Sequence, residues 1–324
     1  MIKRHIVLFS DLIIFAIILF GFMIIAALAA VYILKRPFTE IEIKAETVEI
    51  EGLKKNYNIF FLSDSHICLT DERDDSAVIE KEQLRSAILF TNEKLESWRT
   101  FDALIKKAKG TKQDLMILGG DIIDSAMYAS IEYVKKTMDS QPYPYLYYSG
   151  NHDFEYGTEY YTSTAFSEYL PRLSELNRTK SYQVKEFEDL IIFAADDYGN
   201  NISAEALEGF KKEIKKGKPM VVCLHVPLEP ITGDNSLVEC CKDVMGASAD
   251  GKSRGTIGPN GCTPNNITSE FMKLLMDDDS PVALVLAGHI HFYHKDKLND
   301  KIVQIISGGA YQGNALQISL VGKE

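Results

Sequence analysis

Short blocks of this sequence that carry histidine, aspartate or asparagine could bind divalent cations, and each block comes directly after an apolar run. In chain order the five blocks are Asp64-Ser65-His66, Gly120-Asp121-Ile122-Ile123-Asp124, Gly150-Asn151-His152-Asp153, His225 and Gly288-His289-Ile290-His291. In an α/β sheet, ligands bind at the carboxyl ends of the strands. We therefore expect these blocks to meet at one edge of a sheet and to form a binding site.

Taken singly, each block has a plain structural explanation. A lone histidine after a strand is usually a hydrogen-bonded turn residue, and an aspartate there commonly caps a helix. Taken together, however, five of the seven histidines occupy such positions. A sheet edge with that many polar groups and nothing to bind would be costly in unpaired groups. A binding site is the more economical interpretation.

The ligand types indicate which cations the site would take. Carboxylate and amide oxygens with imidazole nitrogens, and no thiolate, suit Mn, Fe, Zn or a similar divalent ion. The candidate ligands are too many for one ion, so we predict two. A structural zinc site is the alternative, but such sites are closed and typically use four ligands, often cysteine.

In type and order the blocks resemble the motifs of the calcineurin-like metallophosphoesterase family, over about residues 58–309. The resemblance implies a four-layer α/β/β/α sandwich and two metal ions bridged by Asp121. The implied ligands of the first metal are Asp64, His66, Asp121 and His291. Those of the second are Asp121, Asn151, His225 and His289. In the family a hydroxide shared by the two ions attacks phosphorus. His152 would then stabilise or protonate the leaving oxygen, and Asp124 would orient its imidazole.

The chemistry of these groups agrees with the implied roles. Two divalent ions roughly 3.5 to 4 Å apart lower the pKa of a bridging water and neutralise charge on the attacking and leaving oxygens. A carboxylate such as Asp121 can bridge because its two oxygens can serve two cations. The neutral oxygen of Asn151 limits the negative charge around a site that must admit an anion. We expect hydrolysis of a phosphomonoester or phosphodiester.

Two departures from the family leave the substrate open. No arginine follows Asp124, where the protein phosphatases of the family carry one, and this weakens a phosphoprotein substrate. Bulky Phe292 and Tyr293 follow the last block, where members often have small glycines. The expected substrate is a phosphorylated small molecule or a lipid-linked molecule, and a nucleotide-sugar or lipid pyrophosphate is the alternative class. A membrane-tethered pseudoenzyme or scaffold that only binds metal is the alternative function.

The elements that would position these blocks alternate between strand and helix, as in a layered α/β domain. We predict strands over 59–62, 115–118, 145–148, 190–195, 220–224, 282–287 and 302–306, and helices over 81–109, 130–138, 204–216 and 269–276. Residues 227–266 are rich in Gly, Asp, Asn and Ser and show no clear periodicity. A loop of that length is usually a functional insertion or lid, although a disordered surface excursion is the plainer alternative.

Residues 12–34 contain no charged side chain and are followed by Lys35 and Arg36. At about 1.5 Å per residue, such a helix could cross a hydrocarbon core of roughly 30 Å. We predict an uncleaved membrane anchor in preference to a cleaved signal peptide, because the apolar run continues beyond the possible cleavage site. The predicted organisation is a tail at 1–11, the anchor at 12–34, a linker at 35–47 and the metallophosphoesterase domain at 48–324.

Charge and cysteine content set further limits. The net charge of -11 and the pI near 5.2 argue against a broad nucleic-acid-binding face. Positive residues nearly balance on the two sides of residues 12–34, so we place the large domain outside the cytoplasm only because the preceding tail is short. Of the five cysteines, Cys240, Cys241 and Cys262 could form one disulfide or remain free thiols.

Overall fold

The computed structural model describes residues 41–89, 91–92, 95–154 and 163–323. The chain divides into two compact units, residues 1–40 and residues 41–324. The predicted tail at 1–11 and the predicted anchor at 12–34 lie outside the described residues. Within the described ranges, no helix is both long and apolar enough to span a membrane.

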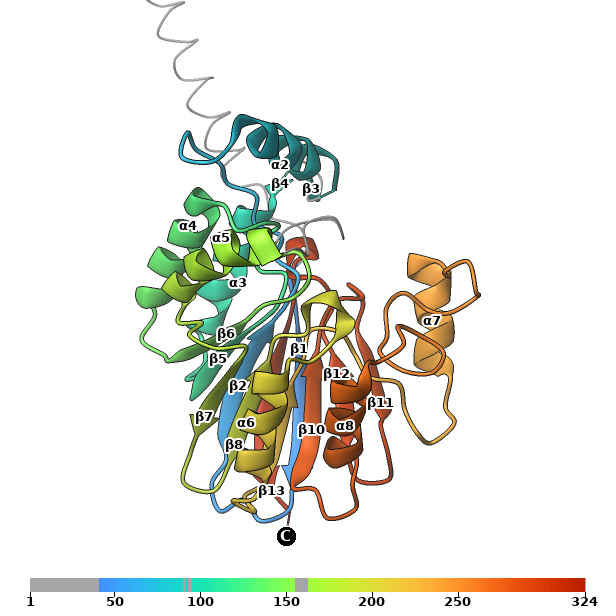
Figure 1. The fold of residues 1–324 in the computed structure, drawn as a ribbon. Coiled ribbons are helices and arrows are strands. Elements are labelled where there is room, and N and C mark those ends of the chain that lie inside the picture. The colour runs from blue at the N-terminus through green and yellow to red at the C-terminus, as the bar shows by residue number, and fades with distance from the viewer. Residues whose placement is uncertain (1–40, 90, 93–94, 155–162, 324) are drawn as a thin grey trace, which may run out of the picture. The chain divides into compact units, whose positions relative to one another are not determined.

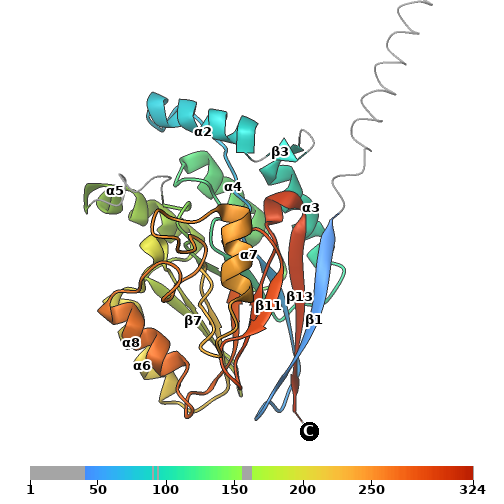
Figure 2. The same ribbon diagram turned by 90° about the vertical axis from the view of Figure 1, so that its right-hand side faces the viewer.

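Two β-sheets form the centre of the second unit (Figures 1 and 2). In the order of its neighbours, the five-stranded sheet contains β1 (Glu42–Ile50), β13 (Asn314–Gly322), β2 (Tyr57–Leu62), β5 (Leu115–Gly119) and β6 (Tyr145–Tyr148). In the same way, the six-stranded sheet contains β11 (His294–Lys297), β12 (Val303–Ile306), β10 (Val282–Ala287), β9 (Met220–Cys223), β8 (Ile191–Ala195) and β7 (Tyr182–Glu186). A small hairpin pairs β3 (Thr91–Asn92) with β4 (Leu95–Glu96).

The central strands of each sheet are parallel. Strands β2, β5 and β6 run in parallel in the first sheet, and β8, β9, β10 and β12 do so in the second. Both faces of these strands are buried, which explains why their sequences are continuous apolar runs. Parallel strands end at the same edge of their sheet, so the loops after them are brought together.

Alternate residues of the strands face alternate layers. Ile59 and Phe61 of β2 point into the core between the sheets, where they meet Val221 and Cys223 of β9. Phe60 of β2 points the other way. The first sheet's outer face is covered by α3 (Ser97–Ala108), α4 (Tyr128–Asp139) and α5 (Ser163–Leu173). The second is covered by α6 (Ala204–Ile214) and α8 (Asn266–Leu275), as Figure 1 shows. The mixed α/β fold with two packed sheets confirms that part of the sequence prediction.

The structure contains strands β7, β11 and β13 and helix α5, which the sequence did not predict, and it differs from the prediction at three further places. The single helix predicted over 81–109 is two helices, α2 (Ser76–Leu89) and α3, separated by the β3–β4 hairpin. Thr91 and Asn92 lie at the break, and both have low helix propensity. The predicted linker at 35–47 ends too late, because β1 begins at Glu42. Polar and apolar residues alternate along β1, and it pairs in parallel with β13.

The third difference is a helix inside the segment predicted as an insertion or lid, residues 227–266. Helix α7 (Ser236–Met245) buries Leu237, Val238 and Cys241. These positions form one helical face, but the polar residues between them hide its period in the sequence. Leu237 and Cys241 pack on Ile290, next to the last histidine block. All five cysteines are free thiols, so Cys240, Cys241 and Cys262 form no disulfide.

Candidate metal centre

The blocks predicted to bind metal occupy the loops after β2, β5, β6, β9 and β10. Main-chain hydrogen bonds join these loops to one another. The N–H of His66 donates to the carbonyl of Asp121 at 2.9 Å, and the N–H of Gly288 donates to the carbonyl of His225 at 2.9 Å. The two sheets therefore bring residues from distant parts of the chain to one edge.

Asp64, His66 and His291 form a first group of candidate ligands. One ligand atom from each lies within 4.8 Å of the others. His291 Nε2 is 3.3 Å from Asp64 Oδ1 and 3.2 Å from His66 Nε2. Two imidazole nitrogens and a carboxylate oxygen that converge in this way can hold a divalent cation.

Asp121, His225 and His289 form a second group within the same 4.8 Å limit. His225 Nε2 is 3.0 Å from Asp121 Oδ2 and 3.8 Å from Asp64 Oδ1. Asp121 Oδ2 is also 4.0 Å from His66 Nε2, so this carboxylate faces both groups. Its position between the two groups is the one that a bridging ligand would need.

The other residues predicted for the site lie on the loop after β6 and on the loop after β5. Asn151 is half-buried, and the N–H of the next residue, His152, donates to Asp121 Oδ1 at 2.7 Å. His152 Nδ1 is 2.9 Å from Asp124 Oδ1, so the predicted pairing of this imidazole with Asp124 is present. His152 also forms a third group with His66 and Asp121. It could therefore bind metal itself, as an alternative to acting on the leaving group.

The backbone at these positions is strained. Among the described residues, seven that are not glycine have positive φ, and the five of them at the site are Asp64, His66, Asp121, His289 and His291. Each such residue costs of order 1–3 kcal/mol, and this strain persists where surrounding contacts enforce it, commonly at functional sites. All five were predicted from the sequence as metal ligands.

Close approach of the loops requires glycine at two positions. A Cβ atom on Gly150 would lie 2.4 Å from Asp121 Oδ1, and one on Gly288 would lie 1.8 Å from Ser63 Oγ. Both distances are shorter than real contacts. These glycines therefore serve the packing of the site, since neither has a positive φ.

The buried charges of the site shift one another's pKa values. Burial raises the pKa of Asp64, but His291 and His225 outweigh this and bring the pKa to about 2. Burial lowers the pKa of His225, but Asp121 and Asp64 raise it well above its ordinary value. Burial and the charge on His225 lower the pKa of His289 to about 4, which keeps its nitrogen available as a ligand.

Two buried polar atoms of the site lack hydrogen-bond partners and are placed where a cation would fit. Asp121 Oδ2 and His225 Nε2 are both fully buried, and neither makes a hydrogen bond. Buried polar atoms normally have such partners. Because the two atoms lie 3.0 Å apart and the ligand atom of His289 lies close to both, a divalent cation would satisfy both of them.

Two residues that were not among the predicted site residues, Asp153 and Arg85, form hydrogen bonds with the loops of the site. Asp153 is buried and accepts main-chain hydrogen bonds from the N–H groups of Asp121, Ile122, Ile123 and Gly150, at 2.6 to 2.9 Å. Its place next to His152 was the available signal. Arg85 of α2 donates to Asp124, and no signal in the sequence connects these two distant residues.

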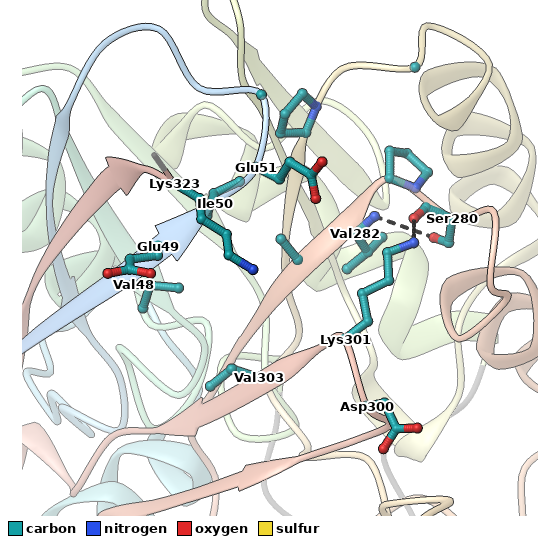
Figure 3. A pocket seen from close by; sticks show the side chains of 15 residues that line it. Val48, Glu49, Ile50, Glu51, Ser280, Val282, Asp300, Lys301, Val303 and Lys323 are labelled. Carbon is teal, nitrogen blue, oxygen red and sulfur yellow. Dashed lines mark hydrogen bonds between the residues drawn. The ribbon is translucent and has the colours of Figure 1, made fainter.

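Two further features do not belong to the predicted set of metal ligands. Cys68, Glu82 and Asp124 form another close group, but burial raises the pKa of the Cys68 thiol, which disfavours the thiolate that binds metals. The pocket in Figure 3 has a volume of about 450 Å³ and is lined in part by Ile50, Val282 and Lys301. It borders the start of β10, whereas His289 follows the end of that strand, so it lies at the opposite edge.

The two-sheet α/β fold brings together groups of carboxylates and histidines that could hold divalent metal ions. A model of the calcineurin-like phosphoesterase family matches residues 57–293. The chain belongs to the calcineurin-like phosphoesterase family, whose members typically use divalent metals. The predicted family is therefore confirmed.

Solved structures resemble the chain at low identity. A dimetal phosphatase from Danio rerio is 11% identical, with a TM-score of 0.46, and the match covers 79% of this chain and 88% of that one. A putative 5'-nucleotidase from Staphylococcus aureus is 14% identical, with a TM-score of 0.43, over 79% of this chain and 49% of that one. A phosphopantetheinyl hydrolase from Mycobacterium tuberculosis is 11% identical, with a TM-score of 0.38, over 83% and 92% of the two chains. The comparison with curated proteins gave no match.

Proposed function

We propose that this protein hydrolyses a phosphomonoester or phosphodiester with two divalent metal ions, Mn, Fe or Zn. The observation that carries the proposal is the position of Asp121. Its carboxylate is fully buried and faces both groups of candidate ligands, at 3.0 Å from His225 Nε2 and 4.0 Å from His66 Nε2. A site for a single ion would not need a carboxylate shared in this way.

The protein residues divide between holding the ions and acting on the substrate. The first ion would be held by Asp64, His66, Asp121 and His291, and the second by Asp121, Asn151, His225 and His289. When bound, two such cations neutralise charge on a phosphoryl group and lower the pKa of water. Asp64, Asp121 and His225 are buried, whereas His289 and His291 are half-buried. The substrate would therefore approach from the side of the last histidine block.

His152 would act on the leaving group. Its side chain is 15% exposed, and Nδ1 faces Asp124, which leaves Nε2 for the substrate. Burial lowers the pKa of His152, but Asp121 and Asp124 raise it above the ordinary value. A protonated imidazole in this position can give its proton to the departing oxygen, and such general acid catalysis contributes typically about 10²- to 10⁴-fold.

The replacement of Asp121 by Asn tests the proposal. The amide keeps the shape of the side chain but removes the charge that would be shared by two cations, so we expect nearly all phosphoesterase activity to be lost. Metal content, measured by mass spectrometry, should fall in parallel. Asp114→Asn is the matched control, because Asp114 precedes the same strand at its other end, where its side chain accepts a hydrogen bond from the N–H of Asn58 at 2.8 Å. Undiminished turnover by Asp121→Asn would refute the shared carboxylate.

We also propose that residues 12–34 anchor the chain in a membrane, with residues 48–324 outside the cytoplasm. The absence of charge in that segment supports the proposal. Cys240 is an exposed free thiol on α7 and provides the test. In intact cells, a membrane-impermeant thiol reagent should label the wild type more strongly than Cys240→Ser, because the other free cysteines are half-buried or buried. Protection of Cys240 until the cells are lysed would place the domain on the cytoplasmic side.

A further inference from the structure

Helix α2 contacts the site through Arg85, which donates hydrogen bonds to Asp124. Over residues 76–87, the buried side chains of α2 are those of Glu82 and Arg85, while Leu84 is 61% exposed. In Figures 1 and 2, α2 lies at the carboxyl-end edge of the sheets, together with the β3–β4 hairpin. A buried arginine needs a specific partner, because an unpaired charge inside a protein is costly.

The partner of Arg85 is the carboxylate that also orients the site's imidazoles. Arg85 donates from Nε to Asp124 Oδ2 and from Nη2 to Asp124 Oδ1, the second bond at 2.9 Å. Asp124 Oδ1 is also 3.0 Å from His66 Nδ1 and 2.9 Å from His152 Nδ1. Arg85 Nη2 itself lies 3.2 Å from His152 Nδ1. Arg85 and Asp124 are both buried.

This geometry restricts the orientation of Asp124. The planar guanidinium forms two parallel bonds with the carboxylate, and such paired bonds define the plane of the carboxylate as well as its position. Oδ2 accepts from Nε of Arg85 and Oδ1 accepts from Nη2, so Arg85 holds both oxygens of the carboxylate. With the plane held, Oδ1 stays directed at the Nδ1 atoms of His66 and His152. Their Nε2 atoms then stay directed at the ion and the substrate.

We propose that Arg85 is a positioning residue for the leaving-group step, and that α2 is thereby part of the active site. Arg85 acts through Asp124, which holds the imidazole of His152 toward the departing oxygen. The inference rests on the proposed function, because protonation of a leaving group is the step that His152 would serve. Arg85, on a separate helix, would thereby affect the rate at which substrates with poor leaving groups are hydrolysed.

The test compares two leaving groups in the full-length Arg85→Gln variant. An alkyl phosphoester needs protonation of its leaving oxygen, whereas a p-nitrophenyl ester does not, because p-nitrophenolate is a good leaving group. We expect kcat to fall roughly 10- to 100-fold for the alkyl ester and less than about threefold for the p-nitrophenyl ester. Arg85→Lys keeps the charge without the paired bonds and should recover only part of the loss on the alkyl ester.

Arg178→Gln is the matched control. Arg178 is also buried and donates two hydrogen bonds to a buried carboxylate, that of Asp196, from Nε at 2.8 Å and from Nη2. Its loss should lower stability as much as the loss of Arg85, without changing the ratio of the two kcat values. An equal fall on both esters in Arg85→Gln, or the same ratio in both variants, would overturn the inference.

A second readout does not depend on turnover. In the metal-free protein, NMR of the imidazole nitrogens reports whether the Nδ1–H of His152 is hydrogen-bonded. We expect Arg85→Gln to weaken that signal and Arg178→Gln to leave it unchanged. An unchanged signal in Arg85→Gln would refute the positioning role. A wild type that hydrolyses neither ester while Arg85→Gln loses the signal would refute the proposed function and leave the positioning of His152 standing.

Discussion

The replacement of Asp153 by Asn should disrupt the loop that carries Asp121. Asp153 is buried, and its two oxygens accept four main-chain hydrogen bonds at 2.6 to 2.9 Å, two on each oxygen. An amide in its place keeps one oxygen and turns an NH2 group toward the other two donors. Those donors then lie buried without an acceptor, next to another donor.

The magnitude follows from the number of donors that lose their acceptor. A buried donor left unsatisfied costs about 1–3 kcal/mol, so two of them cost roughly 2–6 kcal/mol of unfolding free energy. Proteins of ordinary stability have about 5–15 kcal/mol in total. Since one of the donors is the N–H of Asp121, we expect metal content to fall along with stability.

Urea unfolding in excess chelator, followed by circular dichroism, measures the loss of stability apart from any effect of metal. Metal content is then measured on protein that has not been treated. Asp189→Asn is the reference variant. Asp189 is also buried and accepts from the main chain of Lys54 and Lys55 and from the Tyr57 hydroxyl, but it lies outside the candidate metal groups. It should lose stability and keep its metals. An unfolding free energy for Asp153→Asn within about 1 kcal/mol of the wild type would contradict the reasoning.

Three further outcomes are expected. His152→Ala should lower kcat by about 10²- to 10⁴-fold with both metals retained; loss of metal would instead identify His152 as a ligand. A chelator should lower the unfolding free energy by about 2.7 kcal/mol relative to protein with metal at 100 times its Kd, and an unchanged melting temperature would argue against a metal centre. Burial raises the pKa of Asp189, but Tyr57 and two main-chain N–H groups lower it overall. Its stabilising effect should therefore be full above about pH 5 and be lost as the pH falls through the unfolded value of about 3.9 toward the lowered pKa of the folded state. Asp189→Asn should remove this pH dependence of the unfolding free energy in acid unfolding curves. A variant with the same acid unfolding curve as the wild type would show that Asp189 does not contribute to the dependence.

The sequence alone was sufficient for the strands that carry the site and for its candidate ligands. The strand before each block is buried on both faces, so its sequence is an unbroken apolar run with a clear end. Carboxylates and imidazoles that follow such runs are conspicuous, because buried strand ends rarely carry them without a partner. Asp121 and His225 follow strands of different sheets, so the sequence marked both residues but did not show that they approach each other.

Other features depended on tertiary structure. Strand β1 and helix α7 have mixed polar and apolar sequences, and each is defined by what it packs on, β13 for the first and Ile290 for the second. The pairing of Arg85 with Asp124 has no sequence pattern, because an ion pair between distant segments follows from how helix α2 folds back over the sheet edge.

The chemistry of the site divides in the same way. Residue types and their order determined which atoms could bind metal, since those properties are local to each loop. Only the folded chain decided that Asp121 faces both groups of ligands and that one carboxylate, Asp124, serves two imidazoles and an arginine. Distances between side chains from different loops depend on how the two sheets pack, and packing is a property of the whole domain.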